Sequence, residues 1–241
     1  MTATHLPQAP ITSRYALYWA PATESALAAI GRDWLGRDTE GRAVKQRPQM
    51  SGFESFQLEA LTAEPRRYGL HATLKPPFAL AEGTSLDDLD RELTSFASSM
   101  APVQMPALRL SRLGRFLAAT PSAPCSALDT LAARCVTDFD RFRRPLLPAE
   151  LARRASTGLD PIETAHLQRW GYPYVLDRFR FHVTLTGPLD DTEREGLAPQ
   201  LAALFEPALG QAFQLTDIAL FEEVTPGAPF KLVKRFRLGR T

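Results

Sequence analysis

The sequence lacks the features that would place it in a membrane, outside the cell or on nucleic acid. It has no run of about 18 apolar residues that could cross a bilayer, and its first residues have neither the basic start nor the apolar stretch of a signal peptide. Its 28 Lys and Arg residues nearly balance its 27 Asp and Glu residues, which leaves a formal net charge of +1. We therefore expect a cytoplasmic protein that does not bind long nucleic acid and must hold any anion locally.

Cysteine and histidine are scarce as well. Cys125 and Cys135 are the two cysteines, they lie ten positions apart, and no C-x-x-C spacing occurs. We expect both to be reduced structural residues. No H-E-x-x-H motif is present either, and zinc usually takes three protein ligands. A zinc hydrolase is thus a poor interpretation, and neither a metal nor another cofactor is expected.

What the chain does contain is an ordinary globular composition, with 44% hydrophobic and 23% charged residues. We expect residues 1–12 to be a loose tail and residues 13–241 to form a single bilobal domain, with lobe one at 13–125 and lobe two at 126–241. Periodicity and the positions of Gly and Pro predict the elements. The expected strands are 14–20, 68–75, 104–113, 115–119, 175–186, 213–224 and 229–238, and the expected helices are 23–34, 53–63, 85–100, 126–142, 148–154, 161–170 and 192–205.

The order of these elements repeats. Both 68–119 and 175–238 are predicted as strand, helix, strand, strand, and each opens with the same short motif. The motifs are His71-Ala-Thr73-Leu74 and His182-Val-Thr184-Leu185, and the two histidines are 111 residues apart. A single H-x-T-x motif in a strand would most often be structural, but two copies at equivalent places favour a functional pair.

Strand alternation suggests how the motifs work. Side chains two apart share a face, so His71, Thr73 and Lys75 are predicted on one face of their strand, and Arg180, His182 and Thr184 on one face of the other. If the two lobes meet face to face, these polar faces line a common cleft. One imidazole could then accept a proton from water while the other donates one to a leaving oxygen. The threonine hydroxyls could donate hydrogen bonds to phosphate oxygens, and Lys75 and Arg180 could add positive charge.

Several of these residues have an alternative interpretation. The threonines are good strand formers, Lys75 and Arg180 could reach toward water instead of substrate, and Tyr18 is either a stacking platform for substrate or a core residue. We expect His5 to lie in the tail and His166 to be a surface or packing residue. The two basic clusters could bind phosphate, or they could protect an edge strand and solvate a helix end. They are Lys231, Lys234, Arg235, Arg237 and Arg240, and Arg141, Arg143 and Arg144.

The paired motifs resemble the two H-x-[ST]-hydrophobic signatures of the two-histidine (2H) phosphoesterase superfamily. The longer strings RYALYWAP, GLHATLKPPF and GYPYVLDRFRFHVTLTGPL are similar to a bacterial branch described as phosphonate metabolism proteins. This resemblance spans nearly the whole chain. It implies an α+β fold of two pseudo-symmetric lobes, each an antiparallel-rich sheet with helices on its outer face, around a central cleft.

The resemblance also implies a function. It assigns catalysis to His71 and His182, phosphate binding to Thr73 and Thr184, and a small phosphate ester as substrate, with sugar or nucleotide cyclic phosphates as the expected class. Residues 145–170 form an insertion relative to the smallest members and could narrow the cleft. Two alternatives stay open: a non-catalytic binder of a phosphate-containing metabolite or nucleotide, and RNA end processing or 2′,5′ ligase-like activity. We expect a monomer.

Overall fold

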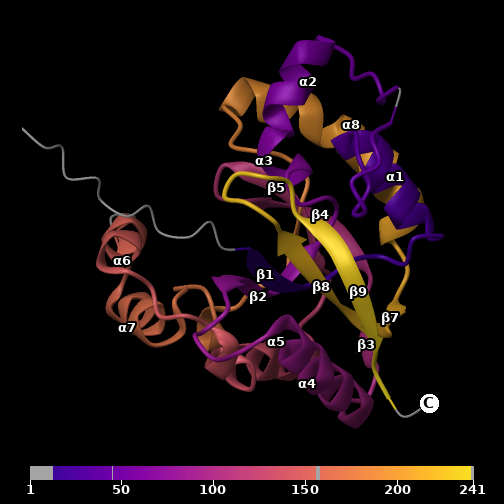
Figure 1. Ribbon diagram of the computed structural model, residues 1–241. Coiled ribbons are helices and arrows are strands. Elements are labelled where there is room, and N and C mark those ends of the chain that lie inside the picture. Colours follow the sequence, from indigo (N-terminus) through magenta and orange to yellow (C-terminus); the bar gives the residue numbers. More distant parts are fainter. Residues whose placement is uncertain (1–12, 45, 156–157, 240–241) are drawn as a thin grey trace, which may run out of the picture.

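The computed structural model describes residues 13–44, 46–155 and 158–239. Both halves of this part of the chain contain helices and strands (Figure 1). The strands are β1 (Arg14–Trp19), β2 (Ala72–Ala79), β3 (Val103–Met105), β4 (Leu108–Leu113), β5 (Phe116–Pro121), β6 (Val183–Thr184), β7 (Phe213–Leu215), β8 (Asp217–Glu223) and β9 (Lys231–Arg237). The helices are α1 (Ala26–Leu35), α2 (Ser55–Leu61), α3 (Ala63–Arg66), α4 (Leu86–Ser99), α5 (Ser126–Thr137), α6 (Pro148–Ala155), α7 (Pro161–Trp170) and α8 (Asp191–Leu209), with 3₁₀ turns η1 (Asp140–Phe142) and η2 (Leu176–Arg178).

Seven strands form one sheet in the order β4-β5-β6-β2-β1-β8-β9, and every pairing in it is antiparallel. Strands β3 and β7 form a separate two-stranded ribbon. The predicted α+β class with an antiparallel sheet is confirmed. The two motif strands, β2 and β6, lie side by side in one continuous sheet, which differs from lobes that meet face to face.

Each half of this sheet takes strands from both halves of the sequence. The hairpin β4-β5 pairs with β6, whereas the hairpin β8-β9 pairs with β1. The first motif strand therefore shares its side of the sheet with the last hairpin of the chain. The second motif strand shares its side with the first hairpin.

The two faces of the sheet carry different side chains, as the alternation in the first strand predicts. Tyr15, Leu17 and Trp19 belong to the main hydrophobic core, together with buried residues of α1, α4, α5 and α8. Ala16 and Tyr18 point the other way and form a small second cluster with strand β8 and Phe230. The helices of the main core thus cover one face of the sheet, and its other face is left for a cleft.

Capping signals place several helix boundaries correctly. At the start of α4, the Ser85 hydroxyl accepts a hydrogen bond from the Asp88 N–H. The Asp88 carboxylate in turn accepts one from the Ser85 N–H. Gly171 ends α7 in the left-handed conformation that favours glycine. In contrast, Pro65 lies inside the short helix α3 and does not close the predicted helix 53–63.

Four strand predictions are wrong in their extent. The predicted strand 104–113 is divided into β3 and β4, and the predicted strand 213–224 is divided into β7 and β8. Strand β2 was expected at 68–75, but it begins at Ala72 and continues through Pro76 and Pro77. Those prolines follow the single residue of β2 that pairs with β6, and they lie where the register between β2 and β1 is irregular. Fewer backbone N–H groups are needed there for hydrogen bonds between strands, so proline is tolerated. The predicted strand 175–186 is reduced to the two residues of β6, preceded by turn η2.

Candidate active site

The two motifs meet at a local twofold axis. Ala72 of β2 pairs directly with Val183 of β6, and these residues occupy the same place in the two motifs. The same antiparallel register puts His71 opposite Thr184 and Thr73 opposite His182. Residues diagonal to each other in such a pair are about 7–8 Å apart, so the two histidines are neighbours on one face of the sheet.

These four side chains open into two adjoining cavities, which together we call the cleft. One cavity has a volume of about 530 Å³ and is lined by His182 and Thr73 among others. The other has a volume of about 340 Å³ and contacts His71, Thr73 and Thr184. Both are bordered by Pro76 and Tyr172, which joins them. The structure thus brings both histidines and both threonines together, while their roles in catalysis stay predictions.

Both imidazoles are held in the same way. The His71 Nδ1 lies 2.9 Å from the Gly69 carbonyl oxygen, and the His182 Nδ1 lies 2.7 Å from the Arg180 carbonyl oxygen. A carbonyl oxygen only accepts hydrogen bonds, so Nδ1 must carry the hydrogen and donate it. The Nε2 atom of each ring is then the one available to a ligand. It accepts a proton when the ring is neutral and donates one when the ring is charged.

The surroundings of His71 favour its neutral form. Its ring lies 4.2 Å from the ring of Tyr18 and 5.2 Å from that of Tyr68, measured between centroids. Burial among these rings, against the opposing effect of the Gly69 carbonyl and with a smaller contribution from the neighbouring His182, lowers the pKa of His71 to about 4. At neutral pH, His71 is therefore poised to accept a proton.

Tyr18 and Arg180, both predicted to contact substrate, have different positions. Tyr18 is 1% exposed and packs against His71, Phe221 and Phe230, as expected for a core tyrosine. Burial raises its pKa well above the ordinary value, so its hydroxyl stays protonated. It borders the cleft behind His71. Arg180 is exposed and lines the larger cavity beside His182.

Lys75 does not join the cleft, which corrects the prediction made from strand alternation. Thr73 pairs with Tyr18 on β1, but Lys75 pairs with Leu17, so one extra residue of β2 is accommodated between these pairs. Such a bulge turns the following side chain to the opposite face. Lys75 is 1% exposed, and its Nζ donates to the Val136 carbonyl of α5 at 3.1 Å. It borders neither of the two cavities that contain the histidines.

Sequence reasoning missed several residues that line the cleft. Arg14 borders the cavity of His71, and Arg178 and Tyr174 border that of His182. Tyr172 borders both. Residues 145–170, predicted to be an insertion, contribute Arg154 of α6 and Glu163 of α7 to the lining of the cleft, and a role in narrowing it stays a prediction. The signal available in the sequence was the GYPYVLDRFR string just before the second motif.

The remaining histidines and cysteines agree with their structural interpretations where they are described. The two ring nitrogens of His166 lie near the Pro173 carbonyl and the Asp177 carboxylate. His5 lies outside the described residues. Cys125 and Cys135 are both free, and burial raises the pKa of the Cys135 thiol to about 12.

The basic clusters lie away from the four motif side chains. Strand β9 is at the edge of the sheet, where Lys234 pairs with Asp90 and Arg235 with Asp217. This agrees with a protected edge strand. Arg240 lies outside the described residues. Arg141, Arg143 and Arg144 form ion pairs with Glu92, Asp140 and Glu150.

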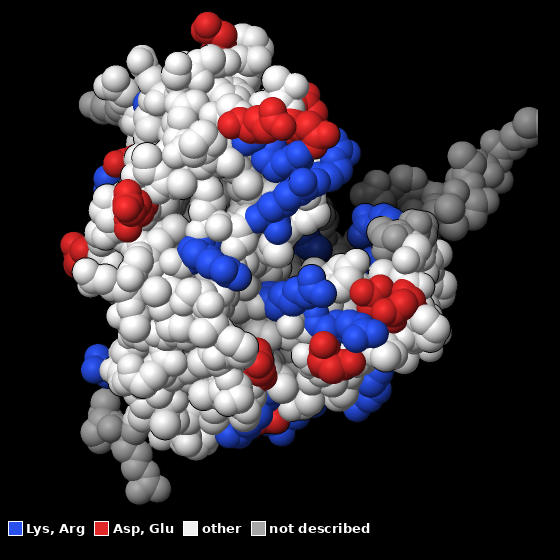
Figure 2. Space-filling model, turned by 180° about the vertical axis from the view of Figure 1, so that it is seen from behind, with Lys and Arg blue, Asp and Glu red and all other residues white. Residues whose placement is uncertain are grey.

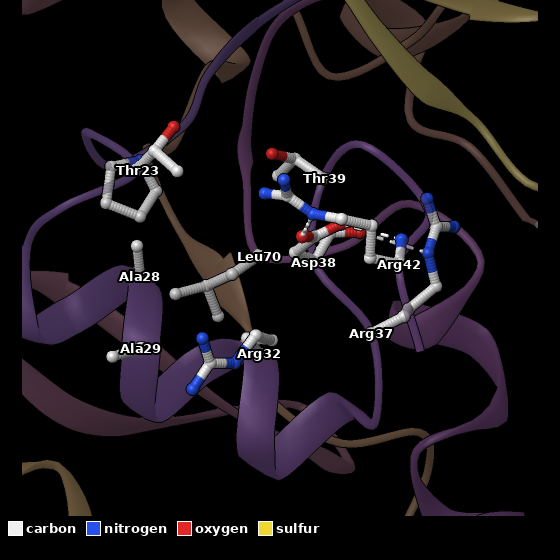
Figure 3. Close-up of a pocket in the computed structure, with 10 residues that line it drawn as sticks. Thr23, Ala28, Ala29, Arg32, Arg37, Asp38, Thr39, Arg42 and Leu70 are labelled. Atoms are coloured by element: carbon white, nitrogen blue, oxygen red, sulfur yellow. Dashed lines mark hydrogen bonds and ion pairs between the residues drawn. The ribbon is translucent and has the colours of Figure 1, made fainter. Parts of the chain in front are cut away.

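A further cavity of about 50 Å³ lies behind the cleft, between α1 and the loop that follows it (Figure 3). The Asp38 carboxylate in this loop accepts hydrogen bonds from the Arg42 Nε atom, at 2.6 Å, and from the backbone N–H groups of Glu40 and Arg42. Arg37 is 7% exposed and donates to the carbonyls of Arg66, Arg67 and Phe230. Through these hydrogen bonds the two arginines hold the loop against the segment leading to His71. We therefore interpret the residues around this cavity as structural.

No group of three or more His, Cys, Asp and Glu side chains among the described residues is arranged to hold a metal ion. No helix among the same residues is long and apolar enough to cross a membrane.

The chain belongs to the family described as "Protein of unknown function (DUF1045)", whose model matches residues 73–231. Two curated relatives carry the name ribose 1,5-bisphosphate phosphokinase PhnN. The protein from Janthinobacterium sp. (strain Marseille) is 39% identical over 90% of this chain and 49% of its own length. That from Laribacter hongkongensis (strain HLHK9) is 37% identical over 92% of this chain and 51% of its own length. The chain thus spans about half of each relative.

Solved structures to which the chain is similar include the LigT protein of E. coli. Its complex with NADP+ has a TM-score of 0.44 and 13% sequence identity, with 95% of this chain and 99% of that chain covered. Its complex with 3′-AMP has a TM-score of 0.42 at 14% identity. Usb1 from Kluyveromyces marxianus has a TM-score of 0.37 at 12% identity, with 95% of this chain and 98% of that chain covered.

Proposed function

We propose that this protein is a metal-independent phosphoesterase that opens a cyclic phosphodiester to a monoester by acid and base catalysis from two histidines. The observation that carries this proposal is the local twofold arrangement of His71, Thr184, Thr73 and His182 on one face of the sheet, open to the cleft. Two proton-transfer groups flanked by two hydroxyl donors match the needs of attack on a phosphate ester.

The surroundings of the two rings suggest a division of roles. His71, neutral at working pH, accepts a proton from water at its Nε2 atom, and the resulting hydroxide forms a bond to phosphorus. As the bond from phosphorus to one ring oxygen breaks, His182 donates its Nε2 proton to that oxygen. The Thr73 and Thr184 hydroxyls donate hydrogen bonds to the non-bridging oxygens, where negative charge increases. Water is consumed, and no other reactant is needed.

The names of the curated relatives suggest a sugar phosphate as the substrate. A kinase of the P-loop class needs a glycine-rich phosphate loop with Gly-Lys, and no Gly-Lys pair occurs in this chain. We infer that the phosphokinase activity of the relatives belongs to their other half. A ribose 1,2-cyclic phosphate, opened at the bond to O2, would yield a ribose 1-phosphate. Such a product is of the same chemical class as the compound in the relatives' name.

A substrate screen tests this proposal. Ribose 1,2-cyclic phosphates and nucleoside 2′,3′-cyclic phosphates are incubated with the protein, with and without a chelator, and phosphate monoester is measured. We expect turnover that persists with the chelator and is nearly abolished in His71→Ala and in His182→Ala, with folding checked by circular dichroism. His166→Gln is the matched control. Full activity in either motif variant would reject the two-histidine mechanism. Tight binding without product in the wild-type protein would instead identify a non-catalytic binder.

The threonines are tested separately from the histidines. Thr73→Val and Thr184→Val keep the side-chain shape and remove the hydroxyl. Loss of one such donor to a transition state costs about 10²-fold in kcat, and we expect a decrease of this order in each variant. Thr94→Val, on the exposed side of α4, is the control. An unchanged kcat in both motif variants would mean that the threonines do not bind phosphate and are present only because they favour a strand.

A further inference from the structure

The end of the cleft on the His71 side is rich in arginine. Arg14 and Arg154 both border the cavity that contains His71. They also border a small adjoining cavity of about 40 Å³, whose wall is strongly basic. The charged residues of that wall are Arg14, Lys75, Arg143, Arg144, Arg153, Arg154 and Glu150. In Figure 2, Lys and Arg side chains gather around a hollow in the surface, although the formal net charge of the chain is only +1.

Arg14 is held in place by a buried carboxylate. Glu223 is fully buried, and it accepts hydrogen bonds from the side chains of Arg14 and Arg67 and from the Gly227 N–H. One carboxylate shared by two guanidinium groups leaves one positive charge in excess. The bond from Arg14 to Glu223 uses its Nε atom, and a guanidinium has five N–H donors. The Arg14 side chain is 28% exposed and lies 5.8 Å from the centre of the Phe230 ring.

Arg154 approaches the same place from helix α6. Its side chain is half-buried, and its NH1 group donates to the Gly171 carbonyl at 2.5 Å. Burial lowers the pKa of Arg154; the nearby Glu150 carboxylate opposes this shift, and the positive charge of Arg14 adds to it. Two guanidinium groups that repel each other in a partly desolvated cavity form a site for an anion.

Arg14 enters the cavity of His71 from a backbone position well removed from the motif. Strand β1 is regular along its pairing with β8, so Arg14, Ala16 and Tyr18 share a face. At about 3.3 Å per residue, the backbone of Arg14 is about 13 Å from that of Tyr18, which contacts His71. A ligand that reaches both places must therefore carry negative charge at two positions.

We propose that Arg14 and Arg154 form a subsite for a second phosphate group, so that the preferred substrate is a cyclic phosphate that also carries a phosphate monoester. This inference rests on the proposed cyclic phosphodiesterase function and names its substrate class. A dianionic monoester matches the two guanidinium groups, and bidentate contacts to them are charge-assisted. Acidic residues also border this region: Glu64 is exposed at the cavity of His71, and Glu150 lies in the wall of the adjoining cavity.

The test compares two substrates that differ only in the remote phosphate, for example adenosine 2′,3′-cyclic phosphate with and without a 5′-phosphate, and the corresponding pair of ribose 1,2-cyclic phosphates. We expect kcat/KM to be about 10²-fold higher for the phosphorylated member of at least one pair, since hydrogen bonds to charged groups are strong. In Arg14→Met and Arg154→Met this ratio should fall toward one. Arg91→Met, on exposed α4, should keep the full ratio.

Failure of this inference is distinguishable from failure of the proposed function. Turnover by the wild-type protein with a ratio near one overturns the subsite alone. If neither compound is turned over, the proposed function fails. Calorimetry then measures the two Kd values: tighter binding of the phosphorylated compound supports the subsite, and equal Kd values overturn it. Arg14→Lys, which keeps the charge beside Glu223, serves if Arg14→Met does not fold, and it should lower the ratio less. A preference for a longer oligonucleotide over the 5′-phosphorylated mononucleotide would also overturn the inference.

Discussion

At the scale of single residues, His71 and His182 hold equivalent positions in different environments. The His71 ring is packed against Tyr18 and Tyr68, whereas the ring of His182 has Phe116 at 6.1 Å and borders the larger cavity. Their Nδ1 atoms are fixed by the same kind of carbonyl contact. The difference between a base and an acid therefore does not come from the motif itself, but from the aromatic side chains that β1 and residues 66–70 place around one copy.

This environment predicts an unusual pH profile. Because the pKa of His71 is lowered to about 4, its neutral form persists to more acidic pH than an ordinary imidazole, with a pKa of about 6.5, would allow. Below about pH 4 the ring is charged and cannot accept a proton, so kcat/KM of the free protein should fall as the pH drops through this value. The profile of kcat/KM and an NMR titration of His71 measure it. An acidic limb at or above about 6.5 would show that another group is the base.

Lys75 gives a second prediction at this scale, because its charge is buried without serving the cleft. Burial lowers its pKa from 10.5 to about 8, and an unfolded chain would still bind this proton between these values. The free energy of unfolding should then rise with pH over this window, by about 3 kcal/mol at most. Lys75→Met fills the same space without a charge, so it should retain activity, match or exceed wild-type stability at pH 7 and lack this rise.

Urea unfolding of both proteins at pH 7 and pH 10 measures the effect. The difference in unfolding free energy between wild type and Lys75→Met should shift in favour of the wild type as the pH increases. Asp140, 4.0 Å from Lys75, keeps Arg143 and Arg169 as partners in the variant, so no carboxylate is left alone. A large loss of kcat in Lys75→Met would instead restore the original prediction that Lys75 contacts substrate.

At the scale of elements, the segment before the first motif is as constrained as the motif. Gly69 has a φ of +74°, and a Cβ atom built on it would lie 3.2 Å from the Cα atom of Thr39. The Gly69 carbonyl is also the acceptor for His71 Nδ1. Arg37 donates to the carbonyls of Arg66 and Arg67, so loop 36–44 and this segment hold each other in place.

Gly69→Ala should therefore impair the active site more than the fold. Gly83 is the matched control, since it has a φ of +78° and open space around a built Cβ. Both alanine variants incur left-handed strain of about 1–2 kcal/mol, measurable as a lower free energy of unfolding. Only Gly69→Ala displaces the His71 acceptor, and we expect its kcat to fall by on the order of 10-fold or more. Equal kcat values in the two variants would mean that the Gly69 carbonyl does not position His71.

Elements whose signals are local were predicted well from the sequence. Strand β1 follows its alternation, and α4 and α7 follow their caps, because those signals lie within the element. The two threonine and histidine pairs were likewise found from their motif. The bulge that turns Lys75 away, the shortness of β6 and the passage of β2 through two prolines depend on partners distant in the sequence. For the same reason Arg14 and Arg154, which meet at the cleft from β1 and α6, carried no signal.

At the scale of the whole molecule, the repeat in the sequence does not correspond to two self-sufficient halves of the sheet. Strand β6 lies between β5 and β2, and both of these belong to the first half of the chain. Strand β1 in turn pairs on one side with β8. Each half therefore supplies strands that the other half requires to complete its hydrogen bonding, and many of the contacts join residues far apart in the sequence.

Dividing the chain between Cys125 and Ser126 tests this arrangement. Fragment 1–125 lacks both β6 and β8, and fragment 126–241 has β6 with neither of its neighbours, so each alone would expose unpaired strand edges and apolar core. We expect neither fragment to show a cooperative thermal transition, and the co-expressed pair to assemble with one. A pair whose first fragment carries His71→Ala should assemble equally well but without turnover of a cyclic phosphate. A cooperative transition in either isolated fragment would instead identify that half as an independent folding unit, because the β2-β6 pairing at Ala72 and Val183 would then not be needed for stability.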